Sequence, residues 1–593
     1  MKKNYFNFNN IILVFAFCNV FIFSSSLNSS FSLLKVSLLY IFVFYCTLYF
    51  IFFILPIYKI ENVKIWILPV LFLSVFVILT IVSQNTHLAV FGTYGRFTGF
   101  MFWFCVIFLM FITAITFENN RNFINILILI GIFVSLYGFM QYSGSSLVIT
   151  SRSYKVIGTL GNPNYVSTLI GVTATLILWR ILQKQKAYIK LILTCLLFLS
   201  LYVIIRSGSV QGFFIFVICT VSYFIGKIFL VNKKVGTLFL SLFSIAIVIG
   251  FLGLLQKGPL KGLLYQYSVT LRGDYWRTAI NMFENDKLKG IGISRYGIEY
   301  QSFRDQTAGL RPSASITDDP HNEILYFLSS GGTILTLTYI LVLILILFVS
   351  IFGLRKSNYD NHDHILIFLS VWIGFRVESL VSVNQVTNNI LEWIVAGTLI
   401  ALSINLKNIK EVSRPSSNRK YKSISLKTPT IISLVLIFTA VIIIPKLSAD
   451  AAYAQYNRGL TSGMNNQTLL EKKSLILEAI NKSPNELIYR DAAVRFMINT
   501  NDFRNGSILV KSLIRIDPSY YSSYELEAII FESEDNLDSA IKSRLKVFSL
   551  DPYDLNNIQA LRNLYLKVNN MSEYNSITNY LNKLNLPLIN DLG

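Results

Sequence analysis

Long apolar runs dominate the first three quarters of this 593-residue sequence and constrain its fold more than any other feature. An α-helix needs about 20 apolar residues to cross the roughly 30 Å hydrocarbon core of a bilayer. Hydrophobic residues make up 53% of the chain, which is more than a water-soluble globule usually carries. The runs predict an all-α, polytopic membrane protein with about 13 transmembrane helices. They lie at 11–27, 34–55, 65–83, 99–117, 122–141, 165–182, 188–205, 210–230, 235–255, 324–353, 364–382, 388–405 and 429–446.

The net charge of +20 lies largely in short loops between alternate apolar runs. Cytoplasmic loops of membrane proteins are enriched in Lys and Arg, so this charge indicates orientation and argues against a nucleic-acid partner. The strongest cluster extends from Lys407 to Lys427. The pattern predicts a cytoplasmic N-terminus, an uncleaved first span, and an outer location for the loop 256–323 and the tail 447–593.

The five cysteines all fall inside predicted spans, which leaves no disulfide framework and no thiolate metal site in the exported parts. They are Cys18, Cys46, Cys105, Cys195 and Cys219.

The character of the chain changes after residue 446, which divides a transmembrane domain, 1–446, from a soluble domain, 447–593. Three similar segments contain Pro484, Pro518 and Pro552, spaced by 34 residues. This is the period of tetratricopeptide repeats, in which each unit is a pair of helices. The spacing predicts a small α-solenoid outside the membrane, with a concave face that binds a peptide or another protein.

The longest polar interruption between spans extends from Leu271 to Gly332 and carries the chemistry-bearing residues. An arginine fork binds phosphate oxygens in a bidentate manner and stays charged at every relevant pH. Arg272, Arg277 and Arg295 are therefore candidates for neutralising a lipid-linked diphosphate at the membrane surface. Trp276 is the aromatic anchor of the same segment.

A base for an acceptor hydroxyl needs a pKa near neutrality, which histidine supplies. His362 and His364 fall on the predicted cytoplasmic side, which leaves His87 and His321. His321 lies in the sequence DDPHNE just before a span, and its neighbour Asn322 is a candidate for substrate binding. The same segment also fits a capped helix start with no chemical role, with Asp318 or Asp319 as the cap.

Two further arginines lie at membrane depth, where an ionisable group is costly. Arg206 ends one predicted span, and Arg376 lies inside another. Each can extend its side chain to the headgroups or face a cavity and hold an anion. The interpretation as substrate-binding residues and the purely structural interpretation both stay open.

The run from Arg272 to Trp276, then KGIGISRYG, then PHNEILYFLSSGG, with GTLGNPN upstream, resembles the O-antigen ligase superfamily. That superfamily also contains O-antigen polymerases and bacterial protein O-oligosaccharyltransferases. The resemblance covers roughly residues 90–400. It implies a GT-C-like helical membrane fold in the bacterial inner membrane, and a metal-independent, inverting transferase without a cofactor.

The resemblance further implies a polyprenyl (undecaprenyl) diphosphate-linked glycan as donor, with His321 at the catalytic histidine and Arg272 at the loop arginine. The sequence departs from the family pattern in two places. The family has a Ser-Arg pair where this chain reads Arg206-Ser-Gly-Ser, which puts the role of Arg206 in doubt, and Lys287 stands where a proline is common.

The acceptor stays open between a lipid A core, another glycan and a protein hydroxyl. A second class of function is a transporter of lipid-linked sugars, which would distribute polar residues through several spans. A third is a membrane scaffold that displays the repeat domain. Polar residues concentrated at one outer face favour the transferase over both.

Overall fold

The computed structural model describes residues 8–56, 58–117, 120–145, 156–254, 257–259, 267–311, 316–356, 359–409, 417–460 and 466–584. The chain is an all-α, polytopic membrane protein. By length and composition, ten helical segments of the described residues are able to cross a membrane, and two shorter apolar helices, Phe8–Phe21 and Phe100–Thr116, accompany them.

Each of the thirteen predicted spans falls on a helix. The helices of the bundle are α1 (Phe8–Phe21), α2 (Leu33–Tyr49), α3 (Ile67–Ile81), α5 (Phe100–Thr116), α6 (Asn120–Tyr142), α7 (Pro163–Leu182), α8 (Ala187–Arg206), α9 (Gln211–Val231), α10 (Lys233–Leu254), α14 (Glu323–Lys356), α15 (Tyr359–Ser379), α16 (Val386–Ser403) and α17 (Ser417–Phe438).

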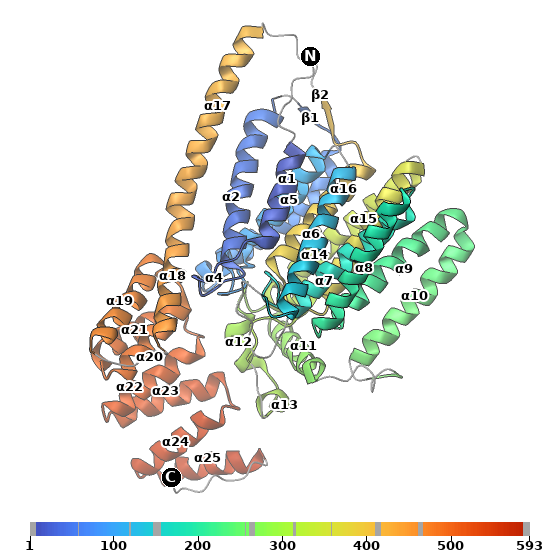
Figure 1. Ribbon diagram of the computed structural model, residues 1–593. Coiled ribbons are helices and arrows are strands. Elements are labelled where there is room, and N and C mark those ends of the chain that lie inside the picture. Colours follow the sequence, from blue (N-terminus) through green and yellow to red (C-terminus); the bar gives the residue numbers. More distant parts are fainter. Residues whose placement is uncertain are drawn as a thin grey trace.

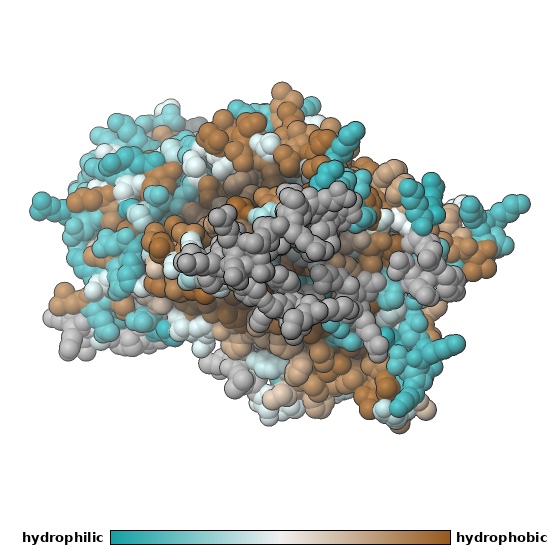
Figure 2. All heavy atoms as spheres, turned by 90° about the horizontal axis from the view of Figure 1, so that it is seen from above, coloured by the Kyte–Doolittle hydropathy of each residue, from teal (hydrophilic) through white to brown (hydrophobic). Residues whose placement is uncertain are grey.

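Burial divides the bundle into an inner and an outer set of helices. α16 is buried along nearly its whole length, whereas α8 and α10 expose large apolar side chains such as Phe198 and Leu242. An apolar surface of this kind suits hydrocarbon, not water. Seen from above, hydrophilic residues gather on the left and again at the right edge, and hydrophobic residues show between them (Figure 2).

The two ends of the bundle differ. At one end β1 (Tyr58–Ile60) pairs antiparallel with β2 (Lys407–Ile409), and this is the one sheet of the described residues. Both strands belong to loops predicted to be cytoplasmic. The segment 410–416, which carries part of the predicted basic cluster, lies outside the described residues.

The opposite end carries the central loop, which folds into three helices (Figure 1). They are α11 (Tyr267–Asn285), α12 (Tyr296–Phe303) and α13 (Gln306–Gly309). Parts of the predicted loop, 260–266 and 312–315, lie outside the described residues. The repeat helices lie at this same end, beside α12 (Figure 1).

The tail consists of helix pairs whose first members begin 34 residues apart, at Leu487, Tyr521 and Leu555. Each second helix ends just before the proline of the repeated segment, because proline cannot continue a helix. The pairs are α18 (Ile444–Gly459) with α19 (Asn466–Lys482), α20 (Leu487–Asn499) with α21 (Phe503–Ile516), α22 (Tyr521–Ser533) with α23 (Leu537–Leu550), and α24 (Leu555–Lys567) with α25 (Met571–Lys583).

The turn inside three successive pairs repeats with the same period. Asn501, Asp535 and Asn569 adopt left-handed backbone conformations, with φ of 57°, 56° and 56°. Asn and Asp tolerate this region better than other residues with a Cβ. The residue after each one caps the next helix with its side chain. The assignment of these pairs to the tetratricopeptide family stays a prediction.

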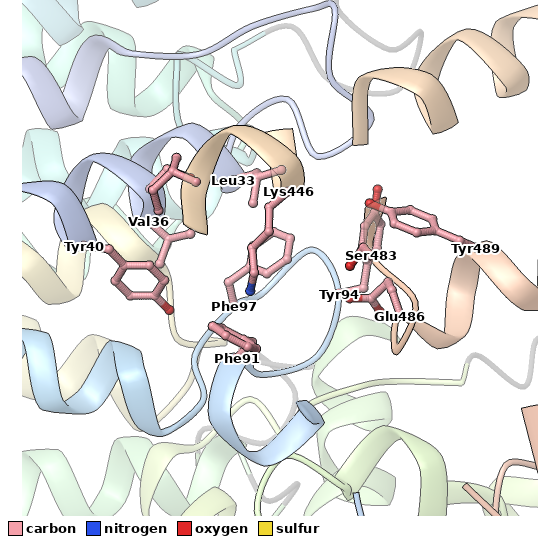
Figure 3. A pocket seen from close by; sticks show the side chains of 12 residues that line it. Leu33, Val36, Tyr40, Phe91, Tyr94, Phe97, Lys446, Ser483, Glu486 and Tyr489 are labelled. Carbon is pink, nitrogen blue, oxygen red and sulfur yellow. The ribbon is translucent and has the colours of Figure 1, made fainter. Parts of the chain in front are cut away.

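The membrane bundle and the tail share one continuous helical segment. Thr428–Gly459 runs through the π-helical turn η3 (Thr439–Ile443) into α18, so the predicted boundary at residue 446 falls inside a helix. Beside this junction, Lys446 lies over the ring of Phe91 at the edge of a small cavity of about 30 Å³ (Figure 3). The hydroxyl of Tyr94 bonds Asp450, one helical turn further along α18.

Two buried ion pairs join the tail to the central loop at the two ends of α12. Arg295 donates to both carboxylate oxygens of Asp517 at 2.7 and 3.1 Å, and the two side chains are 2% and 0% exposed. Arg304 donates to Asp551 at 2.6 Å. Asp517 and Asp551 occupy the same position in successive repeats, so two neighbouring units hold one loop helix.

We expect Asp517→Ala to destabilise the full-length protein by about 3 kcal/mol, the lower end of the range for a broken buried pair, because the buried Arg295 loses its bonds to Asp517 and keeps only Glu299 as a carboxylate partner. The measurement is the midpoint of thermal unfolding in detergent. Glu534→Ala is the matched control, since Glu534 is exposed in the same repeat and such changes stay within about 0.5 kcal/mol. Equal midpoints for the two variants would contradict a tail docked through this pair.

Candidate functional site

The backbone around His321 fixes which imidazole nitrogen carries the proton. Asp319 accepts the backbone N–H of His321 at 2.7 Å, and His321 adopts a left-handed φ of 57°. This turn places Nδ1 of the ring 3.0 Å from the backbone carbonyl oxygen of Asp319. A carbonyl only accepts hydrogen bonds, so Nδ1 bears the hydrogen in the neutral ring. Nε2 is left with its lone pair, as a general base requires.

The ring of His321 is held against an aromatic face. It stacks on Tyr275 with ring centroids 5.3 Å apart and an interplanar angle of 30°. Burial and, to a smaller extent, the positive charges of Arg272 and Arg96 lower the pKa of His321 to about 4, although its hydrogen bond to the Asp319 backbone raises it. The imidazole is therefore neutral at neutral pH.

Arg96 comes from the loop between α4 (Thr86–Phe91) and α5 and reaches the same place. Its guanidinium grips Asp318 with two bonds of 2.9 and 3.1 Å, and a third, longer bond of 3.4 Å reaches Tyr165. The loop bends back sharply after Arg96, where Phe97 has a φ of 56°. A bidentate ion pair positions the segment that carries His321.

Arg272 is a half-buried guanidinium of α11 that has no carboxylate partner within the described residues. Burial lowers its pKa, while the neighbouring rings of Tyr275 and Tyr165 raise it. The charge of Arg272 lowers the pKa of His321, so the two groups lie within electrostatic range. A desolvated arginine without an anion is costly, and an anionic ligand at this position would compensate it.

The two glycine motifs of the sequence pack against each other beneath this site. Backbone amides of Ile291 and Gly292 donate to the carbonyls of Ser329 and Ser330 at 2.9 and 3.1 Å. α14 is broken at Gly332, where φ is 64°, and a Cβ there would lie 2.4 Å from the backbone of Leu288. The glycines of the KGIG and SSGG motifs are therefore explained by packing, because the backbones of the two segments approach each other too closely for side chains.

The GNPN turn before α7 contacts the SGSVQG turn after α8. Asn162 caps α7 by accepting the backbone N–H of Asn164. Asn164 accepts a 2.8 Å bond from Ser209. The nearby Arg206 is exposed and lies over the rings of Tyr142 and Tyr202, 5.0 and 5.2 Å from their centroids.

The other predicted substrate-binding arginines have carboxylate partners. Arg277 is exposed and pairs with Asp274 and Asp305. Arg376 lies in α15, where it bonds Glu323, the first residue of α14, at 2.6 Å and also contacts Glu392 and Tyr339.

Arg295 is bonded to the tail, as described above, and is not gathered with His321. The structure brings His321, Arg272 and the unpredicted Arg96 together and leaves the remaining arginines apart. Their predicted roles in substrate binding stay predictions.

Trp276 and Asn322 both lie close to the site in sequence but have clear packing roles. Trp276 belongs to a hydrophobic cluster with Tyr275, Tyr296 and Tyr300. Asn322 caps α14 by accepting the N–H of Leu325 at 3.0 Å, and it donates to the carbonyl of Leu380. The expectation that Asp318 or Asp319 caps this helix is therefore wrong: Asp318 binds Arg96, and Asp319 shapes the His321 turn.

Residues 195–340 match the family described as Wzy_C: O-Antigen ligase. The chain carries an O-antigen ligase superfamily domain. The matched segment contains His321 and Arg272, while Arg96 and Arg376 lie outside it. No curated protein matches the chain. Members of this family are glycan-transferring enzymes, and the match supports this class of activity for the segment 195–340.

Within the described residues there is no group of three or more His, Cys, Asp or Glu side chains arranged to bind a metal ion. The expectation of a reaction without metal or cofactor stays a prediction.

The lowered pKa of His321 predicts where activity falls on the acid side. Above its pKa the ring is neutral and able to accept a proton, and below it the base is lost. We expect the acid limb of kcat/KM to lie below pH 6.5, the usual histidine value, and to approach pH 4. A limb at or above pH 6.5 would contradict a buried, neutral His321.

The measurement should be made in Asp319→Asn beside the wild type, because burial raises the pKa of Asp319 to about 7. An asparagine side chain still offers an oxygen to the His321 N–H and does not titrate. The acid limb of kcat/KM that remains in Asp319→Asn therefore reports the protonation of His321.

Proposed function

We propose that the protein transfers a glycan from a polyprenyl (undecaprenyl) diphosphate carrier to an acceptor hydroxyl, in a reaction of the O-antigen ligase type. The observation that supports this most is the neutral imidazole of His321, with Nε2 unprotonated, in range of a buried guanidinium, Arg272, that has no carboxylate partner among the described residues. The imidazole of His321 is able to accept a proton, and the guanidinium of Arg272 is able to bind a diphosphate.

His321 acts on the acceptor in this proposal. Nε2 takes the proton of the acceptor hydroxyl as its oxygen forms a bond to the anomeric carbon of the donor sugar. The hydrogen bond from Nδ1 to the Asp319 carbonyl stabilises the imidazolium that forms, as a fixed acceptor does in other general-base sites. Attack on the face opposite the leaving group inverts the anomeric centre.

Arg272 acts on the donor. The bond between the anomeric carbon and the diphosphate oxygen breaks, and the diphosphate leaves with the electron pair. A guanidinium placed where negative charge develops lowers the barrier. Arg96 is a positioning residue, because its two bonds to Asp318 hold the segment on which His321 lies.

The proposed location is the outer face of a bacterial inner membrane, with a cytoplasmic N-terminus and an exported tail. The alternation of lysine-rich loops supports it. So does the separation of the β1–β2 end of the bundle from the end with α11, α12 and the repeat helices (Figure 1). A glycolipid, a glycan or a protein hydroxyl all suit the same base as acceptor.

His321→Ala should reduce turnover by about 10² to 10⁴ with donor binding nearly intact, because a general base contributes only to the chemical step. Arg272→Lys should also reduce turnover and weaken donor binding, since a point charge does not replace a bidentate fork. The assay is transfer from purified lipid-linked glycan to lipid, glycan and peptide acceptors at saturating donor.

His87→Ala is the control for this series. His87 lies in α4, and its ring is near that of Phe91. Burial lowers the pKa of His87, and the charge of Lys446 in α18 also lowers it. Its loss should leave turnover nearly unchanged. Near-normal activity in His321→Ala would reject the mechanism and direct attention to Asp318, Asp319 or Glu323 as the base.

A further inference from the structure

A cavity of about 760 Å³ lies between the central loop and the repeat domain. Its volume lies within the range found for small-molecule and cofactor sites, roughly 300–1,000 Å³. It is distinct from the His321 site, since none of His321, Arg272 and Arg96 lines it. We call it the interdomain groove.

The repeat domain builds one wall from equivalent positions of successive units. Residues 520–522 and residues 554–556 are 34 apart and line the groove together, as do Asp491 and Glu525. The wall includes the rings of Tyr520, Tyr521 and Tyr553. A surface that repeats its lining residues in this way suits an extended ligand that lies along the repeats.

The other wall is one face of α12 and the segment that follows it. Gly297, Gln301 and Arg304 face the groove at helical spacing, while Tyr296 and Tyr300 on the adjacent face of α12 pack into the cluster beside Tyr275. One thin helix therefore separates the groove from the aromatic residue that stacks on His321.

The groove also reaches the catalytic segment directly through Gly297. A Cβ at this position would lie 2.9 Å from Cα of Asp318, so the helix backbone touches the residue that Arg96 grips. A ligand in the groove is thus one layer of chain away from His321.

The lining carries three arginines and four carboxylates, and every arginine already has a carboxylate partner, which argues against a polyanion. Arg304 pairs with Asp551, Arg311 with Asp274, and Arg495 with Asp491 and Glu525, while Asp554 accepts from the Tyr521 hydroxyl. What remains is a dense set of hydrogen-bond donors and acceptors beside three tyrosine rings. A sugar hydroxyl both donates and accepts, and the C–H face of a sugar ring packs well on an aromatic ring.

We propose that the interdomain groove binds a carbohydrate chain, either the glycan of the donor or that of a glycan acceptor. The proposal rests on the proposed function and extends it, because it assigns the repeat domain to the substrate glycan. The repeat domain then has two tasks: it braces α12 and aligns the glycan beside the reaction centre.

Asn556→Trp tests the groove with little risk to folding, because Asn556 is exposed in the groove lining and the indole fills space there. The matched control is Asn563→Trp, an exposed position of the same helix that does not line the groove. Two measurements use the full-length protein in detergent. One is calorimetric titration with oligosaccharide released from the cell's own lipid-linked glycan, and the other is KM for donor and for each acceptor.

We expect Asn556→Trp to weaken oligosaccharide binding by about tenfold or more, with kcat at saturating substrate within about twofold and the control unchanged. A raised KM for donor assigns the groove to the donor glycan, and a raised KM for a glycan acceptor assigns it to the acceptor. Unchanged oligosaccharide binding, or a raised KM for a peptide acceptor alone, overturns the proposal.

The titration also separates this proposal from the transfer function. His321→Ala should bind the oligosaccharide as the wild type does. If the wild type transfers no glycan to any acceptor but binds oligosaccharide in a manner that Asn556→Trp abolishes, the transfer function fails and the groove stands.

Discussion

The carbonyl oxygen of Asp319 determines what His321 can do, because it accepts a hydrogen bond from Nδ1 and leaves Nε2 as the free lone pair. The rest of the outer end of the molecule holds this short turn in place. Arg96 grips Asp318 from a different loop, and α12 packs on Asp318 through Gly297. The site therefore depends on loops that are remote in sequence and are positioned by the helices around them.

The same dependence explains why the tail is docked on the loop. α12 is only two turns long, and a helix of that length is not stable alone in water. Arg295 and Arg304 at its two ends are bonded to Asp517 and Asp551 of successive repeats. Buried ion pairs contribute little net stability but fix a geometry, because either charge alone is costly. The tail therefore fixes the position of the loop helix α12.

Local pattern in the sequence was enough to predict the membrane helices, the 34-residue helix pairs, and the choice of His321 and Arg272 as candidates. Hydrophobic periodicity and loop charge are local properties of the sequence, so they can be recognised without knowing the tertiary structure. The partners of the arginines were not predictable in the same way. Arg295 reads as a phosphate ligand in sequence, yet its partner Asp517 is 222 residues away.

Arg96 was missed for the same reason. It stands in an unremarkable glycine-containing turn, and Asp318 is also 222 residues distant. The one available signal was the placement of both segments on the predicted outer face. A shared location on the outer face limits the residues that Arg96 could contact. It does not identify Asp318 as the partner, because every outer loop has the same location.

Histidine-selective ¹⁵N NMR of the full-length protein tests the central claim most directly, with the His321 signals assigned by their loss in His321→Gln. We expect a neutral ring at pH 7, with a hydrogen on Nδ1 and none on Nε2. A ring protonated on both nitrogens, or one with its hydrogen on Nε2, would contradict it, since neither form accepts a proton from an acceptor hydroxyl at Nε2.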